Sequence, residues 1–408
     1  MQNLLNVSRR NFIVGASAAG LSIGVLASCS GSESSEDISN LPNPDEVNAW
    51  VHIGNDDTVT IRIARSEMGQ GTLTGLAQLV AEELECDWTK VTTEYPTPGE
   101  SVARDRIWGS FSTGGSQGIR GSHQYVREGG AAARIMLIEA AAAEWGVPVE
   151  ECVAENSEIR HTKSKKKTTY GKVAVAASKL APPIEVTLKD PSEWKVAGQP
   201  KMRLDTADKI TGVQKYGADL VMDGMLNASI KTSPKRGGTL KSYDEAAIIN
   251  MPGVRKVVKV GDNAVAVVGD TWWQANKALD ALPIEWEAGE GSDFSSEAFD
   301  AVLNEGLEAD DAGVGNSVGD VKAAFESAAN IVEATYTAPF QNHAPMEPMN
   351  TTALWTEEKC EIWCPTQNGE SALAATAEAA GLLIEQCEVY KLLLGGGFGR
   401  RGMPDYVH

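Results

Sequence analysis

The first 29 residues constrain this chain more than any later segment, because they set the state in which it leaves the cytoplasm. Ser8-Arg9-Arg10-Asn11-Phe12 is a twin-arginine signature, the signal of an export pathway that moves folded proteins. The uncharged stretch 13–28 is rich in small residues and is shorter than the roughly 20 strongly apolar residues of a membrane span. The sequence therefore predicts a body that folds before export.

The end of this leader predicts a lipid anchor. Leu26-Ala27-Ser28-Cys29 has the small-residue pattern that precedes the lipid-modified cysteine of bacterial lipoproteins. The alternative is an ordinary signal peptide followed by a chance cysteine. Residues 30–46 are mostly Ser, Gly, Glu, Asp, Asn and Pro, a composition typical of a flexible linker. We expect a periplasmic or cell-surface protein that the twin-arginine pathway exports and that lipid on Cys29 holds at the membrane.

Charge and cysteine content exclude several classes of partner and site. The chain has a net charge of −20, and the leader contributes only Arg9 and Arg10 to its charged groups. Such an acidic body argues against a nucleic-acid partner. The five cysteines beyond Cys29 have no iron–sulfur or zinc spacing, so no metal-ligating set of side chains is predicted. Cys360 and Cys364 alternate within a strand-like run and are predicted to be neighbouring core thiols rather than a disulfide.

Hydrophobic periodicity predicts a mixed α/β (α+β) body. Residues 50–53 and 59–63 alternate around Gly54-Asn55-Asp56-Asp57, which indicates a hairpin. Apolar residues recur at helical spacing over 72–84 and 123–145.

Two linkers are predicted between three larger parts of the body. The stretch 181–202 is rich in proline and polar residues, and the stretch 288–320 is acidic and contains glycine. They separate parts at 47–180, 203–287 and 321–408. The middle part shows short strands at 226–232, 254–260, 264–268 and 284–286, with helices at 244–250 and 272–282, a compact mixed module.

Two glycine-rich segments lie in the first part. Glu67-Met68-Gly69-Gln70-Gly71 stands between a strand and a helix, where glycine lets the backbone approach a ligand and a helix N-terminus offers free N–H groups to an anion. A strand-to-helix turn favours glycine in any case. The run 109–118, which contains Gly114, Gly115 and Ser116, suits a phosphate cradle, with a flexible surface loop as the alternative.

Two further segments lie in the last part. Residues 341–350 form a proline-stiffened stretch that carries His343 and Glu347; a lone histidine is more often a packed hydrogen-bonding group than a catalyst. Gly395-Gly396-Gly397-Phe398-Gly399-Arg400-Arg401 follows the apolar run 392–394, which is predicted to be a strand. Four glycines in five positions indicate backbone exposed to a bound group, and two arginines are available for negative charge.

Two familiar motifs occur without the context that they need. Residues 397–402 match G-x-G-x-x-G but lack the following helix and acidic residue of a dinucleotide site. Residues 114–118 match G-x-S-x-G around Ser116, but 106–113 makes a poor buried strand, which a nucleophile elbow needs.

Taken together, these segments resemble the large molybdenum-cofactor subunit of the xanthine dehydrogenase and aldehyde oxidase superfamily, on the branch of isoquinoline 1-oxidoreductase beta-subunits and membrane-bound aldehyde dehydrogenases. The resemblance covers almost the whole chain after the leader, with its motifs in the branch's order. It implies molybdopterin-binding segments at 47–180 and 321–408 on either side of an a/b hammerhead-like domain at 203–287.

The resemblance also implies roles for individual residues. Gln367 is similar to the glutamine that hydrogen-bonds an oxygen on molybdenum, the one catalytic position matched. The remaining cofactor-binding positions implied are Gly69, Gln70, Gly71, Gly114, Gly115, Ser116, Gly395, Gly396, Gly397, Phe398, Gly399 and Arg400. His343 and Glu347 are expected to shape the substrate pocket, and no side chain is expected to bind the metal directly.

The cofactor implied is molybdenum with molybdopterin or molybdopterin cytosine dinucleotide. The reaction implied is hydroxylation of an aldehyde or N-heterocycle with oxygen from water. Because this chain has no residues spaced for a redox centre, the electrons are expected to pass to a separate iron–sulfur subunit, with a cytochrome c as a further candidate partner.

The chain departs from this family in one respect: no segment matches the motif of its general-base glutamate, and the family's subunits are about twice as long. A fragment of a longer reading frame, a second half on a separate chain and an inactive relative all remain open. Two other functions compete with the hydroxylase: a non-catalytic surface lipoprotein that keeps the fold, and a serine hydrolase using Ser116.

Overall fold

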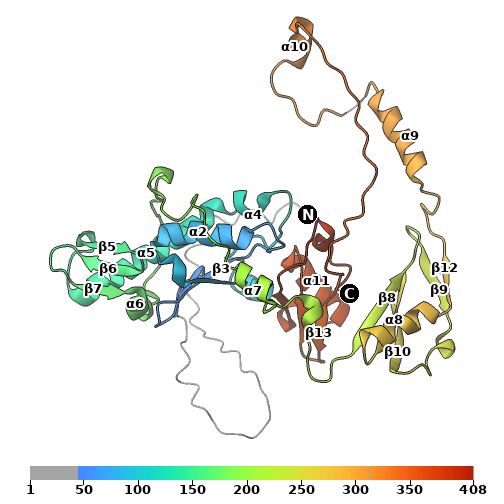
Figure 1. The fold of residues 1–408 in the computed structure, drawn as a ribbon, viewed down its shortest axis with the longest axis horizontal. Helices are drawn as coiled ribbons and strands as arrows, with labels where there is room; N and C mark the ends of the chain where they lie inside the picture. Colours follow the sequence, from blue (N-terminus) through green and yellow to red (C-terminus); the bar gives the residue numbers. More distant parts are fainter. Residues whose placement is uncertain (1–44, 312, 408) are drawn as a thin grey trace. The chain divides into compact units, whose positions relative to one another are not determined.

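A computed structural model describes residues 45–311 and 313–407, so the leader, Cys29 and nearly all of the linker 30–46 lie outside the described residues. The chain divides into two compact units (Figure 1). Unit 1 is formed by Met1–Leu220 together with His343–His408, and unit 2 by Val221–Asn342. Residues 203–220, expected at the start of the middle domain, thus belong to unit 1, and 288–342 belong to unit 2.

The N-terminal part of unit 1 is a four-stranded sheet covered by two helices. The strands are β1 (Asp45–Asn48), β2 (Val51–Ile53), β3 (Val59–Arg62) and β4 (Val91–Glu94), in the order β1-β2-β3-β4. The hairpin of β2 and β3 is confirmed, and helix α2 (Thr72–Leu84) connects β3 to its parallel neighbour β4. Helix α5 (His123–Trp145) packs along α2. Both helices have the bounds that the apolar periodicity predicted.

Shorter elements surround this core. A three-stranded sheet contains β5 (Cys152–Glu155), β6 (Glu158–His161) and β7 (Lys167–Thr169), and it is followed by α6 (Tyr170–Ala177). The remaining helices of this part are α3 (Pro98–Ala103), α4 (Gln117–Arg120), α7 (Thr206–Thr211), η3 (Trp88–Lys90), η4 (Val149–Glu151), η5 (Pro191–Glu193) and η6 (Gly217–Asp219).

The predicted linker 181–202 packs against unit 1 over part of its length. One carboxylate oxygen of Glu82, on α2, accepts hydrogen bonds from the backbone N–H groups of Lys195, Val196 and Ala197 at 2.8, 2.6 and 3.1 Å. Glu82 is buried and also pairs with Lys189 at 2.8 Å. The residues from 189 to 197 are therefore fixed to helix α2.

The C-terminal part of unit 1 is a three-stranded sheet, β13 (Thr352–Trp355), β14 (Cys360–Cys364) and β15 (Cys387–Lys391). Helix α11 (Gly369–Ala380) connects the parallel strands β14 and β15, with η8 (Ile384–Gln386) before β15 and η9 (Arg400–Gly402) after it. Cys360 and Cys364 are buried on the same face of β14 and are not bonded to each other, as the alternation predicted.

Unit 2 has a hydrophobic core between strands and one helix. Its strands are β8 (Asn227–Thr232), β9 (Thr239–Tyr243), β10 (Val254–Val260), β11 (Ala264–Gly269) and β12 (Ile284–Glu287). Helix α8 (Trp272–Ala281) lies across the sheet β10-β11-β8 (Figure 1). Strands β8, β10, β11 and β12 and helix α8 match the predictions to within about a residue, whereas β9 was not predicted. The helix expected at 244–250 is only the short turn η7 (Glu245–Ala247), because Asp244 caps it and Pro252-Gly253 follows closely.

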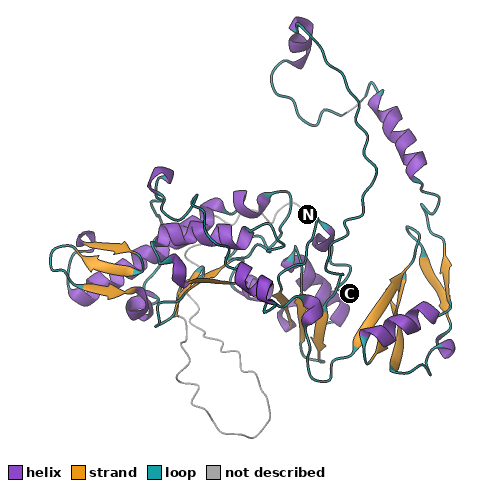
Figure 2. Cartoon of the chain, viewed as in Figure 1, coloured by secondary structure: helices purple, strands orange, loops and turns teal. Residues whose placement is uncertain are grey.

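The rest of unit 2 contains two helices joined by loop. They are α9 (Ser296–Leu307) and α10 (Val321–Ser327), and α9 lies within the stretch predicted as a linker. Figure 2 shows loop from the end of α10 onward through unit 2. Among the described helices, none is both long and apolar enough to span a membrane.

Candidate functional site

The turn between β3 and α2 is organised by a buried carboxylate. Glu67 has no exposed surface, and its Oε1 accepts hydrogen bonds from the N–H groups of Gly69 and Gly71 at 2.8 and 3.0 Å. Its Oε2 accepts one from Leu73 N at 3.0 Å. Glu67 thus fills the anion position at the start of α2. The expectation that these N–H groups are free for an external anion is wrong.

The side chain of Gln70 is also engaged within this turn. Its Nε2 donates to the carbonyl of Ser66 at 2.9 Å, and its Oε1 accepts from Met68 N at 2.7 Å. Arg203 closes the turn from outside by donating to Gly69 O and to Glu67 at 2.8 and 3.0 Å. The turn is therefore rigid before any ligand arrives.

The polyglycine corner, residues 395–399, lies against this turn. Leu394 N donates to Glu67 O at 3.0 Å. A Cβ atom on Gly397 would lie 2.6 Å from Gln367 Oε1 and 2.8 Å from Met68 Sδ, so only glycine fits between the two segments. The apolar run 392–394 is not the predicted strand, since β15 ends at Lys391; its backbone bonds instead to Cys364 and Glu67.

Gln367 joins three segments that are far apart in the sequence. It follows β14, is buried, and accepts a hydrogen bond from Gly399 N at 3.0 Å through its Oε1. Its Nε2 donates to Thr113 O at 2.8 Å, and Thr113 N donates back to Gln367 O at 2.7 Å. Ser66 N completes the junction by donating to Thr113 Oγ1 at 2.9 Å. The glutamine therefore sits where these loops meet.

The glycine run that follows Thr113 is open. Gly114 and Gly115 are exposed, and a Cβ on either would meet nothing within 4 Å. The start of α4 packs on the start of α2, because a Cβ on Gly118 would lie 3.1 Å from Thr72 Oγ1. This run thus begins beside the turn at residues 67–71.

The geometry of Ser116 does not support a serine hydrolase. Ser116 has φ 58° and ψ 26° and stands in a loop rather than at the end of a strand. Its hydroxyl makes no hydrogen bond to a histidine or a carboxylate among residues 45–311 and 313–407. An activated serine needs such a base within reach.

Glu347 holds the polyglycine corner. Its Oε2 accepts from Gly395 N at 2.9 Å and pairs with Arg401 at 3.0 Å. Its Oε1 accepts from Gly217 N and from Asn350 at 3.0 and 3.1 Å. Glu347 is 9% exposed, so its carboxylate has no free oxygen toward a substrate. It was predicted to shape the substrate pocket; in the structure it shapes the polyglycine corner.

The two arginines after the corner differ. Arg401 is fully buried and donates to Gly396 O, Pro365 O and Glu347 O. Arg400, predicted as the cofactor ligand, forms a bidentate pair with Asp405 at 2.7 and 2.8 Å. The sequence predicted a cofactor ligand at Arg400 and did not indicate the structural role of Arg401. Both arginines follow the same glycine run, so their position could not show which one is buried.

His343 and Phe398 lie at the exposed side of the corner. Both side chains are solvent-exposed, and a Cβ on Gly399 would lie 3.8 Å from His343 Nε2. Phe398 has φ 54°, and Gly396 and Gly399 have φ 94° and 92°, a left-handed backbone that glycine adopts without cost.

Two buried cations beneath the corner were not predicted from the sequence. Arg65, 6% exposed, donates to Ser122 Oγ at 2.9 Å and to Ser112 O. Lys391, 7% exposed, donates to Ala64 O at 2.6 Å and lies 4.5 Å from the ring centre of Tyr95 and 5.3 Å from that of Phe111. Burial and the charge of Arg65 lower the pKa of Lys391 to about 7. In the sequence, these roles are indicated only by the position of each cation, with Arg65 shortly before Gly69 and Lys391 shortly before Gly395.

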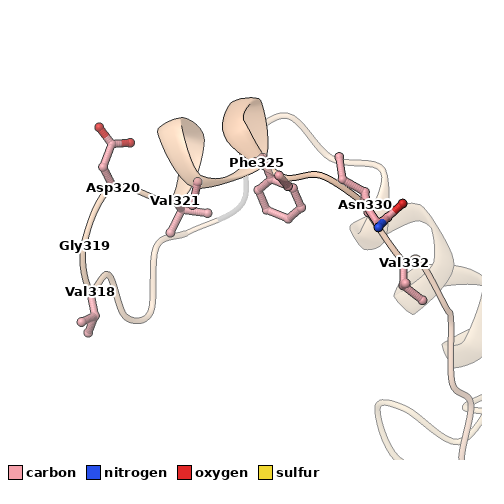
Figure 3. A pocket seen from close by; sticks show the side chains of 10 residues that line it. Val318, Gly319, Asp320, Val321, Phe325, Asn330 and Val332 are labelled. Carbon is pink, nitrogen blue, oxygen red and sulfur yellow. The ribbon is translucent and has the colours of Figure 1, made fainter.

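A hollow also occurs away from these residues. It measures about 460 Å³ and is lined only by residues 318–332 of the loop and helix around α10 (Figure 3). None of the predicted site residues lines it.

Comparison with known proteins identifies the family. Residues 5–221 and 308–408 match two families that are both described as molybdopterin cofactor-binding domains. The chain is 29% identical to a membrane-bound aldehyde dehydrogenase [pyrroloquinoline-quinone] from Gluconacetobacter polyoxogenes, over 98% of this chain and 53% of that protein. It is 26% identical to isoquinoline 1-oxidoreductase subunit beta from Brevundimonas diminuta, over 98% of this chain and 57% of that subunit.

A solved structure is also similar over part of its length. Quinoline 2-oxidoreductase from Pseudomonas putida 86 aligns with a TM-score of 0.38 and 22% identity, over 52% of this chain and 32% of that one. With its two matched segments, the chain belongs to the family of molybdopterin cofactor-binding domains. It spans about half the length of the two relatives named above.

Proposed function

We propose that this chain is the molybdopterin-binding part of an exported molybdenum hydroxylase that oxidises an aldehyde or an N-heterocycle. One observation carries the proposal: the turn at residues 67–71, the segment at 112–116, Gln367 and the polyglycine corner meet at one place, although up to 327 residues separate segments in direct contact. The names of the two relatives support the substrate class.

The residues at this junction fit a bound cofactor. The corner has no side chain at four of its five positions, and a Cβ on Gly395 or Gly397 would lie 2.3 or 2.6 Å from a neighbouring side chain. Backbone close to a ligand is the usual reason for such a run. No group of three or more metal-ligating side chains occurs in the described parts of the chain.

Each part of the junction has a role toward that cofactor. The corner and Gly69–Gly71 would face the pterin with backbone, and Gly114–Ser116 would lie along its tail. Gln367 Nε2 and Oε1 are already engaged by Thr113 and Gly399, so the glutamine fixes the loops in register as well as facing the metal side. The bound cofactor would supply two-electron oxidation with water as the oxygen source.

The partners follow from the same proposal. Electrons would leave to a separate iron–sulfur subunit, with a cytochrome c as a further acceptor, because the described cysteines are five free buried thiols rather than cluster ligands. The twin-arginine leader supports export of the loaded, folded protein, and Cys29 supports a lipid anchor at the periplasmic or outer surface.

The test of cofactor binding is analytical. The full chain, purified from its source together with any chain that copurifies, should contain about one molybdenum per polypeptide by elemental mass spectrometry and a fluorescent pterin after oxidation. A fully active complex without molybdenum would contradict the proposal.

Export is tested separately by replacing Arg9 and Arg10 with lysine, which should retain the protein in the cytoplasm. The anchor is tested by replacing Cys29 with serine, which should release the protein from the membrane fraction.

A further inference from the structure

The buried charges of the described residues are paired, with two exceptions. Ten buried side chains are Asp, Glu, His, Lys or Arg, the residues meant here by ionisable: Arg65, Glu67, Glu82, Glu83, Arg127, His161, Asp205, Glu347, Lys391 and Arg401. Eight of them form an ion pair within 4 Å. Arg65 and Lys391 form none within the described residues. Since a buried charge is costly unless it is paired, a bound anion would stabilise these two.

Both exceptions are cations, and they act on each other. The positive charge of Arg65 is one of the causes that lower the pKa of Lys391. The carboxylates nearest to them along the chain are already engaged: Glu67 by three backbone N–H groups and Arg203, and Glu388 by Thr97 and Gly99. Tyr95, which also faces Lys391, holds its hydroxyl at 2.8 Å from Glu67 N. Neither of these two carboxylates pairs with Arg65 or Lys391.

The position of this pair connects it with the site. Arg65 lies two residues before Glu67 and donates to Ser112, just before the glycine run at 114–115. Lys391 ends β15, four residues before the polyglycine corner. The N–H groups of the turn at 67–71 are occupied by Glu67. A charged ligand at this junction must find its positive partner elsewhere, and these cations are the partner available.

We propose that Arg65 and Lys391 provide the positive charge of the site and bind the phosphate end of the cofactor. Arg65 is the direct partner, because its planar guanidinium presents several N–H donors. Lys391 is enclosed by Tyr95, Phe111 and Ala64 and contributes its positive charge to the electrostatic potential at the site. This inference rests on the proposed function.

The first experiment measures cofactor content. In the full chain, Arg65→Met should reduce pterin and molybdenum per polypeptide by about tenfold or more, because a hydrogen bond to a charged group contributes roughly that factor. Lys391→Met should reduce both by less, and Arg65→Lys should restore most of the content lost in Arg65→Met. The matched control is Arg127→Met, a buried arginine paired with Glu83 at 2.7 Å, which should leave the pterin content of the folded fraction unchanged. Full pterin content in both Arg65→Met and Lys391→Met would overturn the inference.

The second experiment uses cofactor-free protein and inorganic phosphate. Lys391 has its pKa lowered from 10.5 to about 7 in the folded state, so the unfolded chain binds more protons between these values. Stability of the wild type should therefore rise with pH across this window, and Lys391→Met should remove the rise.

Phosphate should raise the unfolding midpoint of the wild type at pH 7 more than that of Arg65→Met or Lys391→Met. An equal response of all three proteins would count against phosphate binding by Arg65 and Lys391.

The two proposals fail in different ways. A correctly folded wild type that contains no pterin, purified with its partners, would contradict the proposed function, while a phosphate response that depends on Arg65 and Lys391 would keep the anion site. A wild type that contains pterin, with variants that contain as much, would contradict only the anion site.

Discussion

The two units of this protein differ in what they bury. All ten buried ionisable side chains lie in unit 1, and none lies in the described residues of unit 2, whose core is the aliphatic set Ile248, Val257, Val265, Val267, Ala278, Leu279 and Leu282. Unit 2 is held by packing of neighbouring strands and one helix. Unit 1 joins loops from distant parts of the sequence, and it does so with buried charge and hydrogen bonds. The difference teaches that buried charge marks the part of the chain where loops distant in sequence are held together.

The strongest test of this comparison is to break a buried ion pair in unit 1. Arg401→Met leaves Glu347 as an uncompensated buried carboxylate and removes the donors to Gly396 O and Pro365 O. We expect a loss of about 3–5 kcal/mol in the free energy of unfolding, measured by urea titration. Hydrogen exchange should quicken at residues 395–399 and stay unchanged in β8, β10 and β11. A loss below about 1 kcal/mol would show that the pair is dispensable.

The second test uses the acid sensitivity of unit 1. Although burial opposes ionisation of Glu46, hydrogen bonds from His52 and Arg104 and the charges of Arg104 and Arg62 lower its pKa from 4.5 to about 2. This stabilisation is complete above pH 4.5 and is lost as pH falls toward 2, because the unfolded chain then binds the proton more tightly. Glu46→Gln should cost about 2–3 kcal/mol at pH 7 and little at pH 2. Equal losses at both values would assign the effect to packing.

The third test compares two glycines in one loop. Gly397→Ala places a Cβ 2.6 Å from Gln367 Oε1, whereas a Cβ on Gly402 meets nothing within 4 Å. We expect Gly397→Ala to cost about 1–3 kcal/mol from overpacking and to lower the pterin content, while Gly402→Ala changes neither. Thermal unfolding and pterin fluorescence provide the two measurements. Similar behaviour of both variants would mean that the corner tolerates side chains.

The smallest effect is expected in unit 2. Arg255 pairs with Asp270 at 2.6 Å, but the two side chains are 59% and 39% exposed. Arg255→Gln should change the free energy of unfolding by no more than about 0.5 kcal/mol, since exposed ion pairs contribute little. If this variant lost as much stability as Arg401→Met, the contrast between the units would disappear.

Local patterns were sufficient to predict several elements of both units. Helices α2 and α5 and the strands β10 and β11 follow from apolar periodicity and turn residues, because their contacts are close in sequence or on one face. The run 392–394 is an instructive exception. Its composition is that of a strand, but only Leu392 N continues the β14-β15 pairing, by donating to Cys364 O, and Leu394 N donates to Glu67 O in a distant segment, a partner that no local property could reveal.

The candidate site was predictable as a set of segments and not as a set of contacts. Glycine runs mark where backbone approaches a ligand, and the structure brings the runs at 69–71 and 395–399 together. The roles of Glu67, Arg65, Arg401 and Lys391 depend on partners up to 327 residues away. Composition gives no indication of which of two adjacent arginines turns inward. For such residues only the tertiary structure distinguishes a ligand-facing group from one that holds a loop.

The discontinuity of unit 1 has a consequence for biosynthesis. The leader is the first part of the chain to leave the ribosome, yet the sheet β13-β14-β15 and the residues that complete the junction are made only after all of unit 2. Unit 2 is contiguous in the sequence and can therefore fold during translation. Unit 1 cannot complete its fold until residues 343–408 have been synthesised. On the proposed export route, which carries folded proteins, the interval before unit 1 closes is when the cofactor would enter.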